Sequence, residues 1–204
     1  MRRIAALALA CLCASLAACT AQPALAPAEP ALGAARPLLG AFVHTLETQE
    51  SATAALTEWC RARHIADPPV IAAHRLKAEM TAPTAAIRSL LSVGQYEPVR
   101  YRHVALFCGA TVLSVAENWY VPSRLTPGMN RDLDTTDAPF GRVAAPLQFI
   151  RQRLESIRGQ AEGCPAGTIL SNRALLQLPD NKPISAVIEC YTAANLGANL
   201  APKR

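Results

Sequence analysis

The clearest hydrophobic pattern in the chain is a pair of strand-like runs near its centre. Residues 99–108 and 111–121 are rich in β-branched and aromatic side chains, contain no internal proline and are separated only by residues 109–110. Such runs around a two-residue connection predict an antiparallel β-hairpin. Alternation along the first run places Arg100 and Arg102 on the same face as its valine and leucine side chains. An arginine on an apolar face either packs its stem and reaches water, or binds an anion inside a pocket.

Weaker patterns outline the segments before this hairpin. Residues 38–63 carry apolar side chains at roughly helical intervals, which predicts one long or two short amphipathic helices with a break at 49–53. Residues 70–80 alternate loosely and predict a strand. A proline-led start followed by spaced apolar residues predicts a helix over 83–94.

The last third of the chain predicts a second hairpin, from residues 168–178 and 184–196 around a proline-bounded turn. Residues 147–157 fit either a helix or a strand. In the final run, Glu189 stands among apolar neighbours. Such an acid is usually solvent-facing or paired with a base, but a buried, protonated carboxyl could also donate a hydrogen bond to a ligand.

The N-terminus is typical of an exported protein. Two arginines follow Met1, an apolar run continues to Ala18, and Cys19 ends a sequence that looks like a bacterial lipobox. We therefore predict a signal peptide over 1–18, a lipid-anchored Pro/Ala-rich tether over 19–37 and one folded domain over 38–204. The anchor would place the protein on the periplasmic side of the cell envelope, more specifically at the outer membrane. The alternative is an ordinary signal peptide cleaved nearby, with Cys19 incidental.

Size and charge narrow the classes of function. The folded part has about 165 residues, enough for one domain but hardly for two. The formal charge of +5 falls to +3 once Arg2 and Arg3 leave with the signal peptide. This excess is too mild for a nucleic-acid partner, and we expect a monomer.

Four cysteines remain after the signal peptide and the lipidated residue are set aside: Cys60, Cys108, Cys164 and Cys190. In an oxidising compartment they could form two disulfides, in any of three connectivities. Strand alternation puts Cys108 on the face of Arg102 and Cys190 opposite that of Glu189, so these two should not pair if the arginine and glutamate share a pocket. Neither the cysteines nor the dispersed histidines have metal-binding spacing; we expect no metal and no cofactor.

The central hairpin is followed by Pro139-Phe140-Gly141 and later by Lys182-Pro183-Ile184 and Glu189. This order of short motifs resembles chorismate–pyruvate lyase and the chorismate-lyase-like (UTRA-like) superfamily, over residues 84–196. The resemblance implies an α+β fold with a single antiparallel β-sheet and helices packed on one face, shared with effector-binding domains of some bacterial regulators. It also implies a strand at 147–157.

The resemblance further implies a ligand site. Arg102 would hold the carboxylate of an aromatic ligand, the backbone at Phe140 and Gly141 would assist, and Glu189 would meet the oxygen substituent of the ring. Arg102 and Glu189 would then be the catalytic residues of a carbon-oxygen lyase. The interval from Pro183 to Glu189 is one residue longer than the pattern, so a β-bulge is needed to keep Glu189 on the pocket face.

Two observations argue against chorismate cleavage. Glu117-Asn118 stands where the lyases carry Gly-Arg, which removes a cation that would stabilise developing charge. Chorismate is also cytoplasmic, whereas this leader exports the chain. Three interpretations stay open: a lyase-like enzyme acting on a small aromatic carboxylate and releasing pyruvate, a non-catalytic lipoprotein that binds such a ligand, and a structural envelope protein.

Overall fold

The structure is a computed structural model that describes residues 29–77 and 81–197. The predicted signal peptide, Cys19 and the first part of the predicted tether lie outside the described residues. Within the described ranges, no helix is both long and apolar enough to cross a membrane.

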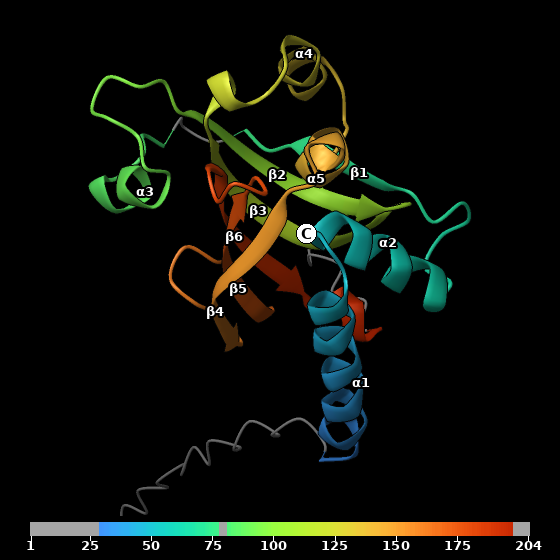
Figure 1. Cartoon of the computed structure of the whole chain (residues 1–204). Coiled ribbons are helices and arrows are strands. Elements are labelled where there is room, and N and C mark those ends of the chain that lie inside the picture. The colour runs from blue at the N-terminus through green and yellow to red at the C-terminus, as the bar shows by residue number, and fades with distance from the viewer. Residues whose placement is uncertain (1–28, 78–80, 198–204) are drawn as a thin grey trace, which may run out of the picture.

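One six-stranded sheet forms the centre of the protein, with every neighbouring pair of strands antiparallel (Figure 1). The strand order is β1-β2-β3-β6-β5-β4. Both predicted hairpins and the strand implied at 147–157 are present, and the strand predicted over 70–80 is shorter than expected. The strands are β1 Ile71–Arg75, β2 Arg100–Cys108, β3 Thr111–Tyr120, β4 Ile150–Arg158, β5 Thr168–Gln177 and β6 Pro183–Thr192.

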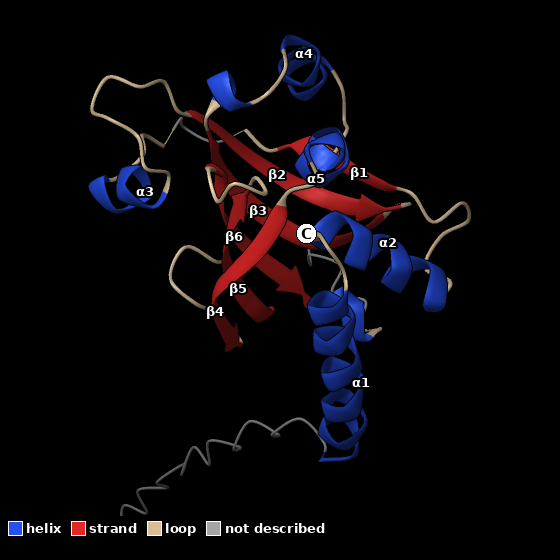
Figure 2. Ribbon diagram, viewed as in Figure 1, coloured by secondary structure: helices blue, strands red, loops and turns tan. Residues whose placement is uncertain are grey.

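Four helices cover one face of this sheet (Figure 2). They are α1 Glu29–Thr48, α2 Ala52–Ala62, α4 Pro127–Thr135 and α5 Phe140–Ala144. The predicted fold class, an α+β fold with a single antiparallel sheet and helices on one face, is confirmed. The six-residue helix α3, Ala85–Leu90, departs from this arrangement because Leu91 at its end packs with Trp119 and Ala186 on the opposite face.

The predicted break between two N-terminal helices is confirmed. α1 ends at Thr48 and α2 begins at Ala52, where the Ser51 side chain caps the helix by accepting a hydrogen bond of 3.1 Å from the backbone N–H of Ala54. Apolar side chains from both helices, such as Phe42 and Leu56, are fully buried against the sheet.

Helix α1 starts nine residues before the predicted domain start at residue 38. Residues 29–37, which we expected in the tether, are helical with Pro37 inside the helix. Their alanines have the highest helix propensity of any residue, which favours a helix without requiring a buried face. Leu38 and Leu39 pack against the core. The division into signal peptide, tether and domain stays a prediction.

The described part of the chain contains two disulfides: Cys60–Cys108 joins α2 to β2, and Cys164–Cys190 joins the β4–β5 loop to β6. Cys108 belongs to the core under α1 and α2. Cys190 alternates with Glu189 along β6 and therefore faces the other side. The prediction that Cys108 and Cys190 do not pair is confirmed.

Candidate functional site

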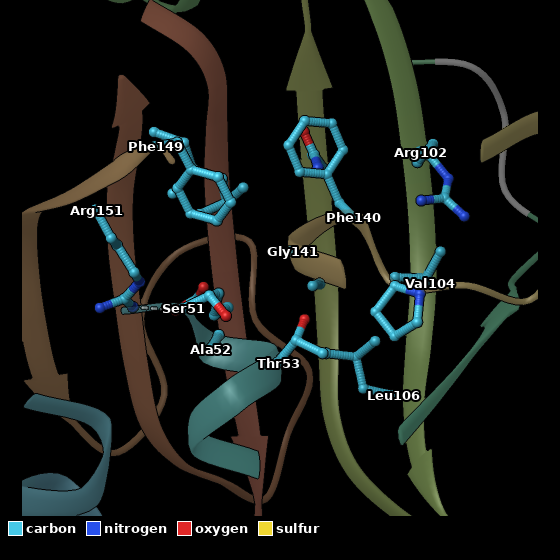
Figure 3. Close-up of a pocket in the computed structure, with 16 residues that line it drawn as sticks. Ser51, Ala52, Thr53, Arg102, Val104, Leu106, Phe140, Gly141, Phe149 and Arg151 are labelled. Atoms are coloured by element: carbon cyan, nitrogen blue, oxygen red, sulfur yellow. Dashed lines mark hydrogen bonds and ion pairs between the residues drawn. The ribbon is translucent and has the colours of Figure 1, made fainter. Parts of the chain in front are cut away.

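A small enclosed space lies on the helix-covered face, where the core under α1 and α2 meets the core under α4 and α5. We call it the inner cavity. Its volume is about 60 Å³. Strands β2, β3, β6, β5 and β4 supply its floor, and the first residues of α2 and α5 cover it (Figure 3). The residues that line it include Ser51, Thr53, Arg102, Asn118, Phe140, Gly141, Phe149, Arg151 and Glu189.

Arg102 enters the inner cavity from β2 and is only 5% exposed. Among the described residues no carboxylate lies within ion-pairing distance of its guanidinium group, whose closest acceptor is the Ala138 carbonyl oxygen, 3.5 Å from Nη2. Its Nε has no hydrogen-bond partner in the described part of the chain. Burial, and then the charge of Arg75, lower the pKa of Arg102. The site therefore contains a buried cation without a counter-charge.

Asn118 lies directly opposite Arg102 in the β2–β3 register. It occupies the position where the lyases were expected to carry a second cation. Its amide oxygen accepts a hydrogen bond from the Ser185 hydroxyl. The amide nitrogen is consequently the group that Asn118 can offer to a ligand.

Glu189 reaches the same cavity from β6, with a side chain 7% exposed. The bulge required by the long Pro183–Glu189 interval is present, because Gln177 pairs with Pro183 while Leu176 pairs with Ser185. This register leaves one extra residue in β6 and turns Glu189 toward the helices. The sequence hypothesis that Arg102 and Glu189 face one space is therefore met by the structure.

Glu189 does not stand alone, however. Its carboxylate forms a buried ion pair with Arg151 of β4 and accepts a hydrogen bond of 2.8 Å from the Tyr191 hydroxyl. Burial alone would lower the pKa of Arg151, but the charges of Glu189 and Tyr191 and the hydrogen bond to Glu189 together outweigh burial, and the pKa is raised. Glu189 is thus an acceptor for two donors, which matches the alternative in which such an acid is paired with a base.

Arg151 is the site residue that sequence reasoning missed. It belongs to the segment whose pattern fitted either a helix or a strand, and only a strand puts Arg151 on the cavity face opposite Leu176. Figure 3 shows Arg151 and Arg102 on opposite sides of the cavity. With Glu189 between them, the three ionic side chains carry one net positive charge.

Phe140 and Gly141 form the first turn of α5, which comes close to the start of α2. A β-carbon on Gly141 would lie 2.8 Å from Thr53 Oγ1 and 3.2 Å from Ser51 Oγ. Glycine is therefore required for the close approach of two helices, and not for a tight turn. The backbone N–H groups of Phe140 and Gly141 belong to a first helical turn and have no acceptor inside the helix, so they are free to donate to a ligand.

Within the described ranges, no three His, Cys, Asp or Glu side chains are grouped so that they could hold a metal ion. The chemistry available at the inner cavity is charge-assisted hydrogen bonding to an anion, from Arg102, Asn118 and the N–H groups of α5.

The fold and the site define the class of protein: a single-sheet α+β domain whose helix-covered face encloses a cationic cavity. No family model matches the sequence. The chain is 39% identical to "Uncharacterized protein y4mC" of Sinorhizobium fredii, over 72% of this chain and 70% of that protein. The chain belongs to the same family as this Sinorhizobium fredii protein.

Solved structures with a similar arrangement are domains of bacterial regulators. The effector domain of PhnF from Mycobacterium smegmatis has a TM-score of 0.48 at 14% identity, covering 71% of this chain and 90% of that one. The C-terminal domain of a histidine utilization repressor from Pseudomonas syringae has a TM-score of 0.47 at 13% identity, covering 66% and 98%. The possible transcriptional regulator YydK of Bacillus subtilis gives 0.45 at 14%, and this chain spans 61% of its length. Likeness at this level carries no inference about ligand or activity.

Proposed function

We propose that the protein binds a small carboxylate in the inner cavity, with Arg102 as the clamp for the carboxylate group. The observation that supports this proposal is the 5% exposed guanidinium of Arg102, which has no carboxylate partner among the described residues. A buried charge without a partner is costly, and an anionic ligand would remove that cost. The N–H groups of Phe140 and Gly141 would donate to the same carboxylate.

The size of the inner cavity sets a condition on the ligand. Its volume of about 60 Å³ is small for a benzoate-sized ligand. An aromatic carboxylate is larger, so Phe140 or Phe149 must rotate when it binds. Both rings line the cavity and are buried against apolar neighbours, so the space they vacate would be apolar as well.

Binding without turnover accounts for more of the site than lyase activity does. The carboxylate of Glu189 is already engaged by Arg151 and Tyr191. Asn118 replaces the second cation that would stabilise charge on the enolpyruvyl group. The lyase interpretation therefore requires Arg151 to leave Glu189 and assist the substrate.

The test of binding is calorimetric titration of the purified protein with 4-hydroxybenzoate. Arg102→Ala should weaken the affinity by about 10- to 100-fold, the equivalent of a charge-assisted hydrogen bond of about 1.5–3 kcal/mol. Arg158→Ala is the matched control, because Arg158 is an exposed arginine at the end of β4. The uncharged analogue 4-hydroxybenzamide should bind poorly to the unmodified protein and to both variants. Equal binding of the acid by the Arg102 variant and the unmodified protein would contradict the proposal.

Turnover is tested separately, by incubating the protein with chorismate and following pyruvate release. A rate that Glu189→Gln abolishes would establish the lyase interpretation. Binding of 4-hydroxybenzoate without pyruvate release would establish the non-catalytic one.

For localisation, we propose that Cys19 is acylated and anchors the protein at the periplasmic side of the envelope. The lipobox-like sequence before Cys19 supports this. Cells expressing the protein should incorporate labelled palmitate into it, and Cys19→Ala or globomycin should prevent normal processing. Absence of label in the unmodified protein would refute the anchor.

A further inference from the structure

Three arginines gather on the helix-covered face, just outside the inner cavity. Arg100 and Arg102 are two residues apart on β2 and therefore point to the same side. Arg75 of β1 pairs with Val104, which makes it a diagonal neighbour of Arg102 on that side. Together with Tyr120 and Asp134 they line a second hollow, which we call the outer groove. Arg102 lines both spaces and forms the wall between them.

The charges of the described residues around the outer groove do not balance. Asp134 of α4 is the carboxylate that faces it, 2.7 Å from Arg100 and 3.8 Å from Arg75. One carboxylate among three guanidinium groups leaves a net charge of +2 among the described residues. The like charge of Arg75 contributes to the lowered pKa of Arg102, whereas the Tyr120 hydroxyl and Asp134 raise the pKa of Arg100.

Fixing α4 to the sheet does not account for this surplus. Arg75 already donates to the backbone carbonyl of Leu133, and Asp134 pairs with Arg100, so α4 is held by these two contacts. A third cation beside them adds repulsion. The side chains of Arg75 and Arg100 are about half exposed, at 50% and 48%, and are thus open to a solute.

We propose that the outer groove is a second anion site, which binds a doubly charged phosphoryl group between Arg75, Arg100 and Arg102. A phosphate monoester carries a charge close to −2, which matches the surplus, and guanidinium groups suit its oxygen geometry. The outer groove has a volume of about 480 Å³, which is ample for a phosphoryl group. This site goes beyond the carboxylate pocket proposed above and shares only Arg102 with it.

Titration with inorganic phosphate at constant ionic strength tests the site. Arg100→Gln should weaken phosphate binding at least about threefold, a modest factor because the groove is half exposed. Arg158→Gln is the matched control: it removes the same charge from an exposed arginine outside the outer groove and should leave affinity unchanged. Asp134→Asn should act in the opposite direction and tighten binding, because it removes the carboxylate that competes with phosphate for Arg100.

Arg100→Gln should lower the phosphate affinity and Asp134→Asn should raise it. These opposite effects distinguish a specific site from general attraction to a basic protein. Unchanged phosphate affinity in both, or no phosphate binding at millimolar concentration, would overturn the proposal. Circular dichroism of each variant establishes that it is folded, and Arg100→Lys should retain part of the affinity. Binding of 4-hydroxybenzoate should not respond to Arg100→Gln, so failure of the carboxylate site and failure of this site give separate results.

The phosphoryl group could belong to a soluble ester or to a lipid headgroup. Glycerol phosphate and vesicles containing phosphatidic acid separate these sources. Binding of the ester, but not of the vesicles, assigns a soluble ligand. If the protein sediments with the vesicles, free phosphate reverses this, and Arg100→Gln abolishes it, then the ligand is the lipid headgroup.

Discussion

Replacing Arg151 by methionine would leave the Glu189 carboxylate buried, with only the Tyr191 hydroxyl as a donor. The two side chains of this pair are 6% and 7% exposed, so water cannot take the place of the missing guanidinium. Breaking such a pair from one side costs about 3–5 kcal/mol. A domain of this size has a total stability of about 5–15 kcal/mol, so the loss is a large part of the whole.

Removing the other partner should cost more. Glu189→Gln leaves two cations, Arg151 and Arg102, at one cavity without a counter-charge. Arg151→Met leaves charges of opposite sign there. The double variant Arg151→Met/Glu189→Gln has no unpaired partner, and its loss should fall short of the sum of the single losses by roughly 2–3 kcal/mol.

Urea unfolding of the oxidised protein measures these values. Trp59 and Trp119 are each 4% exposed, so their fluorescence reports on loss of both faces of the core, and circular dichroism should give the same transition. Arg153→Met is the matched control, because its pair with Glu47 is partly exposed and should be worth less than about 1 kcal/mol. Single losses below about 1 kcal/mol, or a double variant equal to their sum, would refute a coupled buried pair.

Three further outcomes are expected. Gly141→Ala should destabilise the protein by about 1–3 kcal/mol, because the new methyl group meets Thr53. Adding Thr53→Ala should restore most of this loss. Additive losses of the two variants in urea unfolding would contradict the packing explanation. Burial, followed by the Glu189 charge, raises the pKa of Tyr191 well above its ordinary value near 10. The unfolded chain therefore loses this proton first, and the free energy of unfolding should fall as the pH rises above about 10. If Tyr191→Phe leaves this alkaline slope unchanged, another group is responsible. Cys60→Ala/Cys108→Ala should lower the free energy of unfolding by about 4 kcal/mol by the chain-entropy model, since the disulfide closes a 48-residue separation. An unfolding midpoint equal to that of the unmodified protein would refute this.

The sequence by itself determined the elements whose pattern is local. Alternation in the central hairpin put Arg102 on the same face as the valine and leucine side chains of its strand, and the break near Ser51 separated α1 from α2. Counted against the pattern of the lyases that the chain resembles, one extra residue before Glu189 called for a bulge, which the β5–β6 register contains. The hairpin alternation and the helix break follow from periodicity, so neighbouring residues are enough to predict them.

Only the tertiary structure decided which distant groups meet. Glu189 is paired with Arg151, 38 residues away, because β5 separates β4 from β6 and a long arginine reaches across it. The pairing of Cys60 with Cys108 and the place of Arg75 beside Arg102 likewise depend on how α2 and β1 dock on β2. Periodicity assigns a residue to a face, but docking selects its partners there. Docking made Glu189 an ion-paired acceptor and gave Arg102 no carboxylate partner among the residues that the structure describes.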